Sequence, residues 1–132
     1  MIFSRKTQPP IRTLIGEGAV MRGELRFPDG VRIDGEVIGD VIAQPGQRSL
    51  VVISEKARVQ GMVKASHVII NGEVVGPVTS DELLELQPRA KVTGDVRYEL
   101  LEMHPGATID GELKPLQNNE PPALKLAASN DA

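Results

Sequence analysis

The side chains of this sequence that could do chemistry are two histidines and a series of acidic residues. His67 and His104 are the only histidines among 132 residues, and the sequence contains no cysteine. A histidine pair can bind a metal ion or transfer protons. The acids nearest to them along the chain, Glu73 and Glu102, do not show a spacing typical of metal ligands. We therefore interpret both histidines as solvated residues in links between strands, and we expect no metal site and no catalytic role for them.

Acidic residues recur beside glycines, and two stacked carboxylates could act as general acid and base or hold calcium. The other interpretation is that Asp suits turns and that outward charges keep the surface soluble. Arg22, Arg58 and Lys91 occupy comparable positions, so like charges need not stack. A carbohydrate groove would also require stacking aromatics, and Tyr98 is the only aromatic residue in the later part of the chain. An enzyme acting on an acidic polysaccharide is the alternative to a structural role. The acids in question are Glu24, Asp34, Glu36, Asp40, Glu73, Asp95, Asp110 and Glu112.

Composition narrows the class of protein further. The net charge of −3 argues against a nucleic-acid-binding protein, which usually shows a basic excess. The glycines do not form a phosphate-binding loop, since no Gly-x-x-x-x-Gly-Lys occurs, so any polymerisation is expected to proceed without nucleotide. No apolar run approaches the roughly 20 residues of a membrane span. We expect a cytoplasmic protein without cofactors.

The elements that would position these side chains follow a repeat. A pattern of seven residues returns six times: a small residue, an aliphatic two positions later, a glycine after two more and a second aliphatic at the end. Such a unit alternates apolar and other residues but cannot bury its apolar side alone, so the copies are expected to stack. The six copies are residues 19–25, 35–41, 57–63, 72–78, 90–96 and 107–113.

Each copy predicts strands with one buried side. Ala57 and Val59 would point inward and Arg58 and Gln60 outward, because side chains alternate along a strand. A further apolar strand precedes each copy, and the recurrent glycine marks a corner where a Cβ would crowd the residue stacked on it. We therefore predict an all-β, single-domain, right-handed parallel β-helix of about six turns, the hand following that of parallel crossovers. Antiparallel hairpins at the Asp-Gly and Asn-Gly dipeptides, packed as a sandwich, are the alternative fold.

The repeat also sets the expected domain boundaries. Residues 13–114 form the predicted polymerisation domain. Residues 1–12 and 115–132 are short, polar and interrupted by proline, and we interpret them as disordered tails.

A short β-helix has two open ends, and neither tail contains an amphipathic helix that could cover one. We therefore predict end-to-end self-association. The expected polymerisation interface consists of apolar residues of the first and last turns: Leu14, Ile15, Met21, Leu25, Leu100, Leu101, Met103, Ile109 and Leu113. Three outward apolar residues, Ile38, Met62 and Val75, could form a stripe for lateral contact.

The set of repeated pieces resembles the bactofilins, a family of bacterial cytoskeletal proteins. The resemblance covers residues 13–114 and rests on Val31–Val37, Ile70–Val74, Val92–Val96 and Ile109–Leu113. It implies a right-handed β-helix that assembles into nucleotide-independent, non-polar filaments. It also implies a scaffold at the inner face of the cytoplasmic membrane that recruits cell-wall synthesis or hydrolysis enzymes and shapes the cell.

Members of this family often begin with a short membrane-targeting stretch that combines an aromatic with basic residues. The first residues of this chain fit that description. Apolar side chains would enter the lipid interface while each basic residue contributes about 1 kcal/mol with anionic headgroups. The alternative is an ordinary disordered start. The candidate membrane-targeting residues are Met1, Ile2, Phe3, Arg5 and Lys6.

Overall fold

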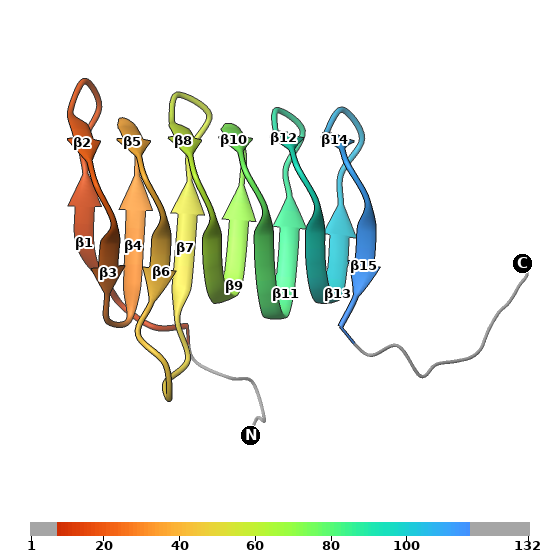
Figure 1. Cartoon of the computed structure of the whole chain (residues 1–132), viewed down its shortest axis with the longest axis horizontal. Helices are drawn as coiled ribbons and strands as arrows, with labels where there is room; N and C mark the ends of the chain where they lie inside the picture. Colours follow the sequence, from red (N-terminus) through yellow and green to blue (C-terminus); the bar gives the residue numbers. More distant parts are fainter. Residues whose placement is uncertain (1–7, 117–132) are drawn as a thin grey trace, which may run out of the picture.

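The computed structural model describes residues 8–116, and this part of the chain is all β (Figure 1). Fifteen strands follow one another without a helix in these residues. They are β1 (Ile11–Ile15), β2 (Val20–Arg22), β3 (Leu25–Phe27), β4 (Gly30–Ile33), β5 (Glu36–Ile38), β6 (Val41–Ala43), β7 (Leu50–Ile53), β8 (Arg58–Gln60), β9 (Val63–Ile70), β10 (Glu73–Val75), β11 (Val78–Leu86), β12 (Lys91–Thr93), β13 (Val96–Met103), β14 (Thr108–Asp110) and β15 (Leu113–Pro115).

As the sequence predicted, the strands wind into a β-solenoid of about six turns. The solenoid has three faces. The first face contains β1, β4 and β7 and then the second halves of β9, β11 and β13. The second face contains β2, β5, β8, β10, β12 and β14. The third face contains β3, β6, the first halves of β9, β11 and β13, and finally β15. The long strands β9, β11 and β13 therefore turn a corner and serve two successive turns.

Every strand pairing in the described residues is parallel, which rules out the hairpin sandwich. The Asp34–Gly35 dipeptide illustrates the reason. The chain does not fold back there, since β4 before it pairs with β7 and β5 after it pairs with β8. The dipeptide makes a corner between two faces.

The core is a set of stacked columns of aliphatic side chains. Along the second face, Val37, Val59, Val74 and Val92 occupy the same register position in successive turns and are fully buried. The residues on either side of each point outward, because side chains alternate along a strand. Burying such columns is the dominant favourable term for a fold that has few aromatic residues. Each inner turn therefore depends on the turns before and after it.

The glycine of each seven-residue pattern stands at the corner between the second and third faces. Gly39 and Gly61 have φ of 149° and 150°, a region that favours glycine. A Cβ on Gly39 would overlap the carbonyl oxygen of Gly23, and a Cβ on Gly61 would overlap that of Gly39. The predicted crowding at this corner is confirmed, and its cause is the backbone of the preceding turn.

The corner between the first and second faces has two forms. Four turns use a longer link that ends in alanine, as at Ala57 and Ala90, whereas two turns use Gly35 or Gly72 in a tight corner. A Cβ on Gly35 would overlap backbone oxygens of Ala19 and Gly16. The longer links project as loops at the upper edge of Figure 1, after β1, β7, β11 and β13.

The link between β6 and β7 extends from the corner between the third and first faces. Two contacts fix it. The guanidinium of Arg48 donates to both carboxylate oxygens of Glu82, at distances of 2.8–3.2 Å. The backbone N–H of Ser49 donates to Oγ of Ser66, and the N–H of Ser66 donates to Oγ of Ser49, at 3.1 and 2.9 Å.

The start of the described chain differs from the expected tail. The first strand begins at Ile11, and the carbonyl of Pro10 accepts a hydrogen bond of 2.9 Å from the N–H of Gly30 in the second turn. The amide of Gln8 lies 3.0 Å from Nδ1 of His67 in the fourth turn. Residues 8–10 therefore follow the outside of the coil and do not cover its end. At the other end β15 extends to Pro115, one residue beyond the expected boundary.

Candidate functional site: the two open ends

The first turn leaves its core side chains partly uncovered. Ile15 and Met21 point inward at the same register positions as Ile33 and Val37 of the second turn. Leu25 takes the equivalent inward position on the third face. The second-turn residues are fully buried, but those of the first turn are only half-buried. No strand of residues 8–116 lies above them.

The last turn is more open than the first. Leu101 and Ile109 are half-buried, while Met103 and Leu113 are 44% and 48% exposed. Their partners one turn earlier, among them Leu86 and Val96, are fully buried. The same aliphatic columns thus run through all turns and end uncovered at both ends.

Two of the expected interface residues point in another direction. Leu14 stacks on the exposed Arg32 and is 59% exposed, and its neighbours Thr13 and Ile15 take the inward positions. Leu100 precedes the inward Leu101 and is 63% exposed. By register both lie on the outside of the end turns, so they would contribute at the rim of an end contact.

The ends also expose backbone groups. In the described part of the chain, the larger sheet is edged by β1 and β3 at one end and by β15 and the second half of β13 at the other, and β2 and β14 edge the smaller sheet. An edge strand carries a row of unpaired N–H and C=O groups that can pair with another chain. Each end therefore offers an apolar centre surrounded by backbone donors and acceptors.

The three residues considered for lateral contact do not form one stripe. Ile38 and Val75 share a column on the second face, but Gln60 lies between them. Met62 stands beyond the glycine corner, where its N–H donates to Oδ1 of Asp40 at 2.9 Å. All three are half-buried.

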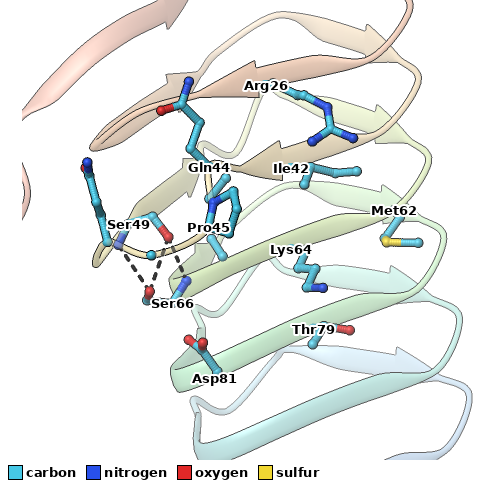
Figure 2. Close-up of a pocket in the computed structure, with 14 residues that line it drawn as sticks. Arg26, Ile42, Gln44, Pro45, Ser49, Met62, Lys64, Ser66, Thr79 and Asp81 are labelled. Atoms are coloured by element: carbon cyan, nitrogen blue, oxygen red, sulfur yellow. Dashed lines mark hydrogen bonds between the residues drawn. The ribbon is translucent and has the colours of Figure 1, made fainter.

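Met62 instead lines a groove of about 530 Å³ on the third face (Figure 2). The link after β6 forms one wall, and Lys64 and Thr79 from successive turns form the floor beside it. Among residues 8–116, Asp81 is the only acidic residue in its lining, and no histidine takes part. The groove therefore lacks the pair of carboxylates that acid–base cleavage of a polysaccharide would require.

The acids beside the corner glycines have structural partners. Arg58 lies between Glu36 and Glu73 on the second face, with N···O distances of 3.7 and 3.2 Å. Oδ1 of Asp95 accepts the N–H of Glu112 in the next turn at 3.1 Å, and this hydrogen bond holds the pKa of Asp95 below its usual value. The arrangement favours the structural interpretation of these acids over the catalytic one.

His104 lies in a link between strands, as expected, but His67 is placed differently. His67 is not a solvated link residue: it lies in β9, and only 9% of its side chain is exposed. The acid beside it is Glu85 and not Glu73, with 3.9 Å between Nε2 of His67 and Oε1 of Glu85. Burial lowers the pKa of His67 although the carboxylates of Glu85 and Glu82 oppose the shift.

His104 joins the same group from the last turn. Its Nε2 lies 3.7 Å from Oε2 of Glu85 and 3.2 Å from Oε2 of Glu102. Spacing along the sequence could not reveal this cluster, because its residues lie on three successive turns, along a diagonal of the first face. The signal in the sequence is the register: Glu85 and Glu102 stand at the same position of successive turns.

The candidate membrane-targeting residues lie outside the described residues, so they keep the status of a sequence prediction. Residues 8–116 contain no helix long and apolar enough to cross a membrane.

A parallel β-helix with uncovered aliphatic columns at both ends defines a solenoid suited to self-association. The family model described as "Bactofilin: Polymer-forming cytoskeletal" matches residues 13–114, and the chain belongs to this family. The bactofilin BacO of Myxococcus xanthus (strain DK1622) is 24% identical over 111 residues, which cover 84% of this chain and 85% of that protein. No solved structure matches the chain. The protein is thus a member of a polymer-forming, structural family.

Proposed function

We propose that this bactofilin assembles end to end, without nucleotide, into filaments that lie at the inner face of the cytoplasmic membrane. There it organises cell-wall synthesis or hydrolysis enzymes and helps to determine cell shape. The observation that carries the proposal is the pair of open ends, where columns that are fully buried in the inner turns become half-buried or exposed.

Physical magnitudes support assembly that depends on concentration. Full burial of one aliphatic side chain contributes about 1.5–3 kcal/mol, and the half-buried residues of the ends would gain part of that. Association costs about 4–15 kcal/mol in lost freedom. Several side chains together with the edge strands can exceed this cost, but one charge placed among them would reverse the balance.

Nucleotide independence is supported by the positions of the glycines. Those of the repeat are used at corners, where they permit close approach between turns, and the sequence has no phosphate-binding motif. The membrane and cell-wall roles are supported by the family and by the apolar and basic residues at the start of the sequence.

The direct test is electron microscopy and sedimentation of the purified full chain without nucleotide. Met103→Arg places a charge in the last turn, and Leu25→Arg places one in the first. Each is expected to replace filaments by short, folded species. Thr93→Arg is the matched control, because Thr93 is exposed on the second face, one turn inside the last, and points outward and not into the uncovered columns. Long filaments of either end variant would contradict the proposal.

A further inference from the structure

The cluster on the outside of the first face presents metal-ligand atoms at suitable spacing. One carboxylate oxygen from each of Glu85 and Glu102 and a ring nitrogen of His104 lie within 4.8 Å of one another. A tetrahedral ion with bonds of about 2.1 Å holds its ligand atoms about 3.4 Å apart. The distances from Nε2 of His104 to the two carboxylates, 3.2 and 3.7 Å, lie on either side of that value.

A second, independent observation comes from His67. Its side chain is more than nine-tenths buried, and its Nε2 makes no hydrogen bond within the described part of the chain, although it faces Oε1 of Glu85 at 3.9 Å. Nδ1 is occupied by the Gln8 amide, at 3.0 Å from Nε2 and 3.2 Å from Oε1 of that side chain. With the proton on Nδ1, a lone pair of His67 faces a carboxylate. With the proton on Nε2, the donor is too far from the carboxylate to bond.

Nε2 of His104 has no hydrogen-bond partner among the described residues either. Two imidazoles with unused nitrogens and two carboxylates thus meet at one place in residues 8–116. A buried polar atom without a partner is costly, and a cation held by Glu85, Glu102 and His104 would satisfy the ring of His104 and offset the like charges of the carboxylates.

From this geometry we infer that the protein binds a divalent transition-metal ion of the Zn²⁺ type through Glu85, Glu102 and His104, with the fourth position on the side of His67. The donor set is nitrogen and oxygen without sulfur, which suits Zn²⁺ and its neighbours in the first transition row. His67 is held in place by burial and by Gln8, so it forms the fixed wall of the site. The other three side chains are half-buried or exposed and can close on the ion.

The ion would bind the last turns of the coil together. His104 and Glu102 belong to the sixth turn, Glu85 to the fifth and His67 to the fourth. On β13 the outward Glu102 alternates with the inward Leu101 and Met103 of the open end. Metal binding is therefore expected to stabilise the end turn and to slow hydrogen exchange of its amides.

The test is calorimetric titration of the tag-free full chain with Zn²⁺, together with elemental analysis after dialysis. One ion per chain is expected, bound in the micromolar range or more tightly. Glu102→Gln and His104→Asn are expected to weaken binding by about tenfold or more, since both change a ligand at an exposed or half-buried position. Glu55→Gln is the matched control, because Glu55 is an exposed acid outside the cluster.

Carbon–proton correlation spectra of the histidine rings give a second readout. Zn²⁺ is expected to shift the ring signals of His104 and His67 together. Absence of saturable binding, or equal affinity of the wild-type chain and His104→Asn, would overturn the inference. All four residues belong to one chain, so Leu25→Arg is expected to bind the ion even where it no longer forms filaments. The result is thereby independent of the proposed assembly.

Discussion

The carbonyl oxygen of Gly23 occupies the place where a Cβ on Gly39 would stand. The same relationship repeats from turn to turn at this corner, and it ends at Gly23 itself, where an added Cβ would meet no atom of residues 8–116 within 4 Å. Glycine is therefore required at this corner for two different reasons, depending on the turn. At inner turns glycine serves packing as well as its backbone angle, whereas at the first turn only the angle, with φ of 117°, requires it.

Replacing these glycines tests that distinction. Gly39→Ala is expected to lower the free energy of unfolding by more than the roughly 1–3 kcal/mol of a strained backbone angle, because the methyl group also overlaps backbone. Gly23→Ala is the matched control. Its free energy of unfolding is expected to fall only by the part that comes from the strained backbone angle. Chemical denaturation of both variants, in an unassembled background that blocks both ends (Leu25→Arg with Met103→Arg), measures the difference. Equal losses would show that backbone overlap is unimportant.

Gly23→Ala in the otherwise unchanged chain addresses the first open end. Its methyl group would point away from the coil into the space that a stacked copy occupies. We expect a folded protein whose critical concentration for filament formation rises by about tenfold, equivalent to 1.4 kcal/mol. Sedimentation over a concentration series measures this. An unchanged critical concentration would place the contact away from the glycine corner.

Mixing variants with one blocked end distinguishes two modes of stacking. The non-polar filaments that the family resemblance implies require like ends to meet. Leu25→Arg and Met103→Arg are then each expected to form dimers alone through the remaining end. Head-to-tail stacking predicts that each is monomeric alone and that a dimer appears only on mixing. Light scattering after size-exclusion chromatography decides between these outcomes.

Acid is expected to loosen the last turn. The N–H of Glu112 in the sixth turn donates to Asp95, which lowers the pKa of that carboxyl in the folded protein. A lowered folded pKa means that the contribution to stability is present above the unfolded value and is lost as pH falls through the folded one. The amide signal of Glu112 is expected to move with the Asp95 carboxyl in an NMR titration. Asp95→Asn, which keeps an oxygen acceptor, should remove that pH dependence.

The membrane proposal concerns residues at the start of the chain. Phe3→Ala combined with neutral residues at Arg5 and Lys6 is expected to abolish co-sedimentation with anionic liposomes, because the apolar and the electrostatic contribution are both lost. Filaments display many copies, so the wild-type chain should bind more strongly when assembled. Lys91→Gln, which removes an exposed charge of the coil, is the control. Binding that survives the triple change would contradict the proposal.

The coil could be predicted from the sequence because the pattern of aliphatic residues and glycines is periodic. Val37 and Val59 recur at one place of each copy with Gly39 and Gly61 two residues later, and this pattern is sufficient to stack strands in register. The incompletely buried aliphatic residues at the ends, such as Ile109 and Leu113, follow from the number of copies.

What the sequence did not reveal depends on distances across turns. His67 is close to Glu85 because the chain makes one turn between them, which nearness along the sequence cannot show. The outward direction of Leu14 depends on its exact register with Arg32. The placement of Gln8 beside His67 depends on residues with no repeat pattern at all.

The path of Gln8 and Pro10 along the flank of the coil has a practical consequence. Because Pro10 contacts the second turn and Gln8 the fourth, the chain enters from the side and not through the stacking surface. A fluorescent protein joined upstream is consequently expected to lie beside the filament and to leave the stacking surface free. Labelled and unlabelled copies could then assemble together. The same label attached after Pro115 would emerge from the edge strand of the last turn, next to the neighbouring copy.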